Sequence, residues 1–219
     1  MRLQRDELKS LMKNKLIAAG LREDHADTTA EILTWSDERG YHSHGAVRVE
    51  YYSERIAKGG MTVEPNFEWK ETGPCSAILE GDNGCGYVVA KLGMEKAIEM
   101  AKKNGVAVVG MRNISHSGAI GYYSEMAAKE NLVAITFCQS DPMAVPYGGT
   151  EPYYGTNPIS FGAPTSDDRI VVFDMATTVQ AWGKILDRRS KGLDIPADWA
   201  VDEKGAPVTD PHLVNALLP

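Results

Sequence analysis

Residues 105–128, GVAVVGMRNISHSGAIGYYSEMAA, contain the transition that decides the fold class of this chain. The short apolar run 106–111 predicts a strand, and the segment from Ala119 to Glu130 predicts a helix. Between them, His116 lies in a short polar turn together with Gly118. A strand that leads through a turn into a helix is the repeating unit of an α/β protein.

The same alternation extends on both sides of this unit. Apolar runs at 75–81, 132–138 and 169–175 predict further strands. Helical spacing predicts helices near 87–103 and 179–189. We therefore expect the greater part of the chain to form an α/β domain.

The first sixty residues have a different pattern, because their apolar residues recur at helical spacing. They predict one amphipathic helix within the first twenty residues and a second from about Asp24 to Arg39. A third predicted helix, 43–58, has Ser43 as its N-cap. We expect a helical segment over 1–60, followed by an α/β domain over 61–219.

Composition excludes several classes of function. The chain has 219 residues and 43% hydrophobic content, which is enough to form a core. Its net charge of −7 disfavours nucleic acid as a partner. No stretch approaches the ~18 apolar residues of a membrane span, and the charged N-terminus does not resemble a leader, so we expect a cytoplasmic protein. The three cysteines form no CxxC pair, which disfavours a disulfide framework and a zinc site.

The stretch YHSHGAVRVEYY, residues 41–52, spaces His44, Arg48 and Tyr52 four residues apart. On a helix, such residues lie along one face. A solvated face with a surface ion pair is one interpretation. The other is a pocket for a small acid, because arginine suits bidentate recognition of a carboxylate and a neighbouring histidine can bind a substrate oxygen.

His116 is the candidate for proton transfer. Open α/β sheets bind ligands at the carboxyl ends of their strands, where this histidine is predicted to lie. A neutral imidazole, with a reference pKa near 6.5, is a suitable general base. The alternative is a histidine that only caps backbone groups.

Two segments of the second half are candidates for ligand binding. The glycine- and proline-rich loop 139–157 is longer than an ordinary connection, and long ordered loops are often functional. A strand predicted to end at Asp174 turns into a helix predicted near Thr177 or Thr178. The carboxylate can hydrogen-bond a ribose and the helix N-terminus can bind phosphate, although a simple helix cap has the same pattern.

Signatures of other chemistries are weak. Gly84-Cys85-Gly86 imitates the start of a dinucleotide fingerprint, but Val89 stands in the place of the third glycine. No G-x-S-x-G elbow supports a hydrolase. His42 and His44 could ligate a metal with His116, but no HExxH motif accompanies them, so we expect no metal.

Several long motifs together resemble the malate/L-lactate dehydrogenase family, whose NAD-binding fold is not a Rossmann fold. The resemblance implies a mixed sheet in the α/β domain. The resemblance covers essentially all 219 residues and keeps the motifs in order. The motifs are RGYHSHGAVRVEYY (39–52), ETGPCSAIL (71–79), GVAVVGMRNISHSGAIGYYSEMAA (105–128), CQSDPMAVPYGGTEPYYGTNPISFGAP (138–164) and FDMATTVQAWGK (173–184).

This resemblance implies NAD-dependent oxidation of (S)-ureidoglycolate to the 2-oxo acid oxalurate, a step of allantoin breakdown, by a homodimer. It implies that His116 takes the hydroxyl proton. The substrate-binding positions fall on Ser43, His44, Arg48 and Tyr52. The cofactor positions fall on Ser140, Asp174, Met175 and Ala176.

Two other functions remain open. The same fold can act on another small acid, such as malate, lactate, sulfolactate or diketogulonate. Chains of the family continue beyond residue 219 with a glycine-rich segment and a lysine that contacts the cofactor. We therefore expect the domain over 61–219 to be incomplete and to bind NAD weakly, and a truncated, catalytically inactive chain is the second alternative.

Overall fold

The computed structural model describes residues 3–219, which form two compact units. Unit 1 holds the residues up to Ala134 together with Gly162–Val171, and unit 2 holds Ile135–Phe161 and Val172–Pro219. The helical segment predicted for residues 1–60 lies in unit 1, beside other elements. A domain boundary at residue 60 stays a prediction.

The predicted N-terminal helices are present. A capping box between Gln4 and Glu7 begins the first helix, and Leu16 and Leu33 are fully buried between the first two. A short 3₁₀ turn then precedes the third α-helix. The elements are α1 (Arg5–Ala18), α2 (Glu23–Glu38), η1 (His42–His44) and α3 (Arg48–Ala57).

The prediction of one helix over 43–58 with Ser43 as its N-cap was wrong. The carboxylate of Asp37, on α2, accepts the backbone N–H of Ala46 at 2.7 Å. Gly45 lies against this carboxylate in an extended conformation (φ −97°, ψ −145°), and a Cβ at Gly45 would collide with it. The tertiary contact with Asp37 therefore interrupts the helix.

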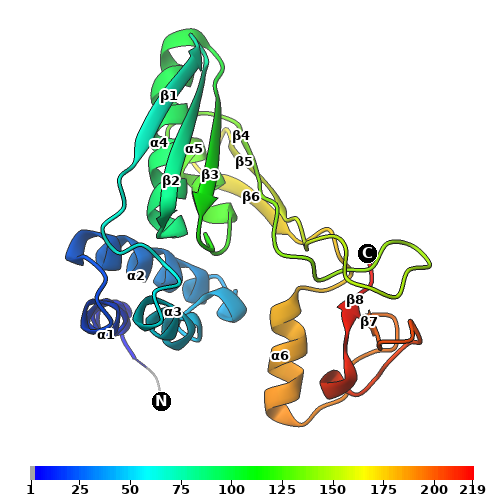
Figure 1. The fold of residues 1–219 in the computed structure, drawn as a ribbon. Helices are drawn as coiled ribbons and strands as arrows, with labels where there is room; N and C mark the ends of the chain where they lie inside the picture. Colours follow the sequence, from blue (N-terminus) through cyan, green and yellow to red (C-terminus); the bar gives the residue numbers. More distant parts are fainter. Residues whose placement is uncertain (1–2) are drawn as a thin grey trace. The chain divides into compact units, whose positions relative to one another are not determined.

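A mixed sheet forms the centre of unit 1, as predicted. β1 (Glu68–Gly73) pairs antiparallel with β2 (Ser76–Gly84), which pairs parallel with β3 (Val108–Ile114). The crossover between the parallel strands is α4 (Gly86–Asn104), which covers one face of this sheet in Figure 1. The last helix of the unit is α5 (Gly121–Lys129). β1 was not predicted, because its sequence EWKETG is polar and almost entirely exposed.

A second sheet has the strand order β4-β5-β6. Its strands are β4 (Ala134–Phe137), β5 (Ile159–Pro164) and β6 (Ile170–Met175). β4 and β6 correspond to predicted apolar runs, whereas β5 was not predicted. Its sequence, ISFGAP, is short, contains a glycine and ends in a proline, so it gives little strand signal.

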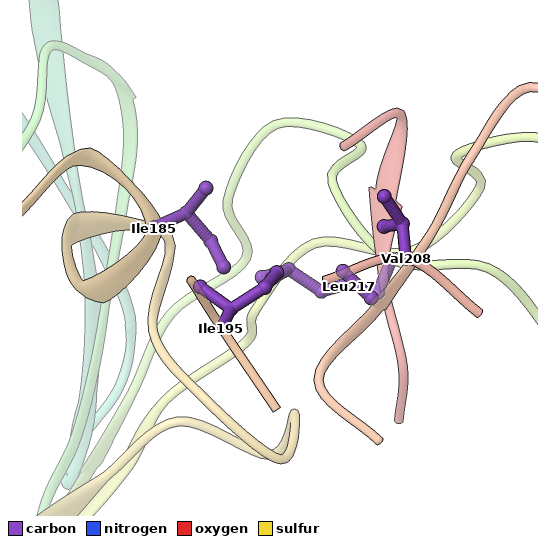
Figure 2. Packing of buried hydrophobic residues seen from close by; sticks show 6 residues of the cluster. Ile185, Ile195, Val208 and Leu217 are labelled. Atoms are coloured by element: carbon purple, nitrogen blue, oxygen red, sulfur yellow. The ribbon is translucent and has the colours of Figure 1, made fainter. Parts of the chain in front are cut away.

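Unit 2 has its own small core, formed around α6 (Trp182–Lys191). Ile185, Ile195, Val208 and Leu217 pack together in this cluster (Figure 2). The remaining elements are β7 (Ala200–Val201), η2 (Pro211–Leu213) and β8 (Ala216–Leu217), and β7 pairs antiparallel with β8.

The helix predicted near Thr177 or Thr178 begins later, at Trp182. The N–H and hydroxyl groups of Thr177 both donate to the carbonyl of Thr156, at 2.9 and 3.0 Å. The hydroxyl of Thr178 donates to the carbonyl of Gln180 at 2.8 Å. These contacts hold the segment after β6 in a non-helical conformation, so Asp174 does not precede a helix N-terminus.

All three cysteines are free thiols. Cys85 is buried, whereas Cys75 and Cys138 are partly exposed. Among the described residues, no helix is both long enough and apolar enough to cross a membrane.

Candidate functional site

His116 lies in the turn between β3 and α5, as predicted. The first residue of α4 fixes this turn, because the N–H of Gly86 donates to the hydroxyl of Ser115 at 2.9 Å. A Cβ at Gly86 would collide with the carbonyl groups of Ser115 and His116. The glycine at the start of α4 therefore allows the close approach that positions His116.

Two tyrosine hydroxyls connect to the imidazole of His116. Tyr52 Oη lies 2.6 Å from His116 Nδ1 and 2.8 Å from Tyr87 Oη. The N–H of Gly118 also donates to Nδ1, at 3.3 Å. Gly118 has φ +78°, and a Cβ there would collide with the ring of Tyr87. The glycine therefore lets the backbone of the turn lie directly against the Tyr87 ring.

His44 lies against the other predicted residues. Its ring stacks on that of His116, with centroids 5.7 Å apart and an interplanar angle of 22°. Ser43 Oγ lies 3.0 Å from His44 Nδ1, and Arg48 Nε donates to the carbonyl of Ser43 at 2.7 Å. The structure thus brings together the histidine of the turn and the four predicted substrate-binding residues, including Tyr52.

Arg48 has the properties expected of a carboxylate-binding residue. It is half-buried, and within residues 3–219 it forms no ion pair with a carboxylate. Only Nε is engaged, so the terminal nitrogens keep the planar fork that suits a bidentate ligand. Among the described residues, the structure therefore does not support the alternative interpretation of Arg48 as part of a surface ion pair. Its contact with a substrate stays a prediction.

Burial makes both histidines poor cations. Burial, reinforced by Arg48, lowers the pKa of His44 from 6.5 to about 4. Burial, reinforced by His44 and Arg48, lowers the pKa of His116 to about 3. Burial also raises the pKa of Tyr52 and of Tyr87. At neutral pH the site therefore consists of neutral rings and neutral hydroxyls beside one arginine.

The predicted cofactor residues belong to unit 2, where hydrogen bonds connect the long loop with the end of β6. Ser140 Oγ accepts the N–H of Thr156 at 2.8 Å, and the N–H of Ser140 donates to Asn157 Oδ1 at 3.1 Å. The carbonyl of Thr156 in turn accepts from Thr177. Ser140 is thus linked through Thr156 to the segment that follows Asp174.

The side chains of this group fit a dinucleotide. Asp174 is partly buried and lies near Cys138, whose pKa is raised by burial and then by this carboxylate. Met175 exposes 52% of its surface. A carboxylate suits the hydroxyls of a ribose, and an exposed thioether beside the small Ala176 suits an aromatic ring. The donor set is therefore compatible with the NAD that the sequence resemblance implies.

Sequence reasoning missed two residues that shape the site, Tyr87 and Asp37. Tyr87 follows directly after the glycines that begin α4, but its contact with Tyr52 spans 35 positions and leaves no local pattern. Asp37 holds the η1 turn through His42 Nδ1 at 2.9 Å and through Ala46. No group of three potential metal ligands comes together in the part of the chain that the structure describes.

Known proteins share both the sequence and the fold. The chain is 60% identical over all 219 residues to the ureidoglycolate dehydrogenase (NAD(+)) of Escherichia coli O157:H7, and it spans 63% of that protein. It is 41% identical over 204 residues to the malate dehydrogenase of Pyrococcus abyssi, covering 93% of this chain and 56% of that protein.

A solved structure with the same fold is the crystal structure of malate dehydrogenase from Entamoeba histolytica. It has a TM-score of 0.94 and 31% identity, with all of this chain and 63% of that chain covered. The chain thus spans less than two thirds of these relatives. The sequence profile described as malate/L-lactate dehydrogenase matches residues 3–219, and the chain belongs to this family.

Proposed function

We propose that the site around His116 transfers the proton in an NAD-dependent oxidation of (S)-ureidoglycolate to oxalurate. The observation that carries the proposal is the arrangement of His116, His44 and Arg48, which places a neutral imidazole pair beside an arginine that has no carboxylate partner among residues 3–219. The 60% identity to a ureidoglycolate dehydrogenase supports this substrate among small hydroxy acids.

In this mechanism Arg48 binds the substrate carboxylate with its two terminal nitrogens. Ser43 or His44 holds the reacting oxygen or the ureido end. His116 accepts the proton of the 2-hydroxyl group as that carbon loses a hydride and its C–O bond becomes a carbonyl. The products are the 2-oxo acid, the reduced cofactor and one proton, so charge and electrons balance.

NAD, when bound, supplies the hydride acceptor. Ser140, Asp174, Met175 and Ala176 would hold it: Asp174 through ribose hydroxyls, Met175 and Ala176 through apolar contact, and Ser140 through its hydroxyl. The hydrogen bond that the Ser140 N–H donates to Asn157 Oδ1 fixes its backbone, and the one that its Oγ accepts from the Thr156 N–H fixes its hydroxyl, before any ligand arrives. Such preorganisation reduces the entropy lost on binding.

A substrate panel tests this function. We expect (S)-ureidoglycolate to give the highest kcat/KM when NADH formation is followed by absorbance at 340 nm. Malate is the second candidate, supported by the 41% identity to a malate dehydrogenase, and lactate, sulfolactate and diketogulonate complete the panel. A higher kcat/KM with any of these acids would replace the proposed substrate, and NAD binding without any turnover would contradict the proposed reaction.

The proposal extends to location and assembly. We place the protein in the cytoplasm, as its sequence composition suggests, and we propose a homodimer with the active site near the subunit contact, which the family resemblance implies. Cell fractionation tests the first statement, and native mass spectrometry tests the second. A monomer with full activity would contradict the role of the subunit contact.

A further inference from the structure

The hydroxyl groups of Tyr87 and Tyr52 form a buried chain that ends at one nitrogen of His116. Tyr87 Oη contacts Tyr52 Oη, and Tyr52 Oη contacts His116 Nδ1. We propose that Tyr52 and Tyr87 are positioning residues that hold the resting imidazole of His116 as the tautomer with its proton on Nε2. In that tautomer Nδ1 is an acceptor, and Nε2 presents a hydrogen-bond donor.

Burial determines which group donates in each of these two hydrogen bonds. Tyr87 is 1% exposed, and Tyr52 is its only hydrogen-bond partner among residues 3–219. A hydroxyl has one proton to donate, and a buried donor without an acceptor is disfavoured. Tyr87 therefore donates to Tyr52. The proton of Tyr52, which is 2% exposed, is then directed to His116 Nδ1, its other partner.

A backbone hydrogen bond shows independently that His116 Nδ1 is an acceptor. The N–H of Gly118 points at His116 Nδ1 at 3.3 Å, and a backbone N–H can only donate. Nδ1 therefore accepts from both sides, from Gly118 and from Tyr52. Because burial lowers the pKa of His116 to about 3, the ring is neutral near pH 7 and has one proton to place. That proton lies on Nε2.

This arrangement has a consequence for the proposed function, on which this part of the inference rests. A ring that is to accept a hydroxyl proton at Nε2 must first carry its own proton on Nδ1. The exchange removes one proton from Nε2 and adds one to Nδ1, with no change in total charge. Tyr52 must then accept from Nδ1 and donate to Tyr87, which leaves the Tyr87 proton without an acceptor among the described residues.

Nuclear magnetic resonance of the ligand-free protein tests the inference directly. In protein labelled with ¹⁵N at histidine, correlations between ring carbon-bound protons and ring nitrogens distinguish a protonated from an unprotonated nitrogen. At pH 7 we expect the wild-type His116 to show a protonated Nε2 and an unprotonated Nδ1. A protonated Nδ1 would overturn the proposal. This measurement needs no activity, so its failure is distinguishable from failure of the proposed dehydrogenase function.

Three variants test the role of the tyrosines. The double variant Tyr52→Phe/Tyr87→Phe removes both hydroxyls, and the ratio of the Nε2–H to the Nδ1–H tautomer should fall by about 5–150-fold, the effect of losing the penalty for an unpaired buried hydroxyl. Tyr87→Phe alone should keep the wild-type tautomer, because Tyr52 still has Nδ1 as its acceptor. Tyr51→Phe, which removes an exposed neighbouring hydroxyl, is the control.

Unchanged His116 nitrogen shifts in a folded double variant would show that the tyrosines do not set the tautomer. Loss of the Nε2–H tautomer in Tyr87→Phe would also overturn the argument about direction. If the double variant does not fold, the wild-type measurement and Tyr87→Phe still decide the matter.

Discussion

Acid should destabilise this protein through the two partly buried histidines of the candidate site, His44 and His116. The folded state lowers the pKa of His116 from 6.5 to about 3 and that of His44 to about 4, with burial as the main cause. Below pH 6.5 the unfolded chain therefore binds protons that the folded chain does not bind. The free energy of unfolding is therefore undiminished above pH 6.5 and decreases as the pH falls towards the folded-state pKa values.

The magnitude follows from the size of these shifts. Each pH unit below 6.5 costs about 1.4 kcal/mol per histidine that is protonated only in the unfolded state. Between pH 7 and pH 5, His116 should account for a loss of about 2 kcal/mol in the free energy of unfolding, and His44 for a similar amount. Such a loss is a large part of the roughly 5–15 kcal/mol that stabilises a typical domain.

Urea unfolding at pH 7 and pH 5, followed by far-UV circular dichroism, measures this loss. The carboxylates titrate in the wild type and in a His116→Gln variant alike. The difference in the loss of unfolding free energy between the two proteins therefore reports the contribution of His116. The variant should lose about 2 kcal/mol less than the wild type between the two pH values. The same substitution at exposed His212 controls for the removal of an imidazole from the sequence. An equal loss in wild type and His116→Gln would refute the reasoning.

Three further predictions concern single substitutions. His116→Asn should lower turnover by about 10²–10⁴-fold with little change in NAD affinity, and near-normal steady-state turnover would remove His116 from the mechanism. Arg48→Lys should weaken the apparent affinity for substrate although the charge is kept, because an ammonium lacks the planar fork; equal affinities would return Arg48 to the solvated-face interpretation. Gly118→Ala should destabilise the fold more than Gly105→Ala by about 1–3 kcal/mol in denaturant titrations, because both glycines have positive φ but only a Cβ at Gly118 meets another side chain. Equal losses in the two glycine variants would show that the ring of Tyr87 moves aside freely.

Local patterns predicted the elements that carry most of the site. Apolar periodicity predicted the strand before His116 and the helix after it, and both are present. The spacing of His44, Arg48 and Tyr52 correctly suggested that they gather on one side, although the helix that was to carry them is interrupted at Gly45. That interruption depends on a carboxylate from another helix, which periodicity within one segment cannot reveal.

Long-range contacts explain the other differences. β1 and β5 are strands because they pair with neighbours, and neither has the alternation or the apolar run by which a strand is predicted. In the sequence Tyr87 is only the first residue of a predicted helix, and the tertiary structure brings its hydroxyl to Tyr52. The identity of a cofactor or substrate came from the family resemblance, since the geometry alone shows a half-buried arginine beside a neutral imidazole.

The backbone contact at Gly86 has a consequence for how this fold can vary. The carboxyl ends of β2 and β3 pair at Gly84 and Ile114, and the turn after β3 is enclosed by Gly86 on one side and Tyr87 on the other. An insertion in the turn 115–118 would separate these groups, so this turn cannot lengthen as functional loops usually do. New substrate specificities in this fold should therefore evolve through changes in the η1 turn. Loop grafting intended to redesign specificity should leave residues 115–118 intact.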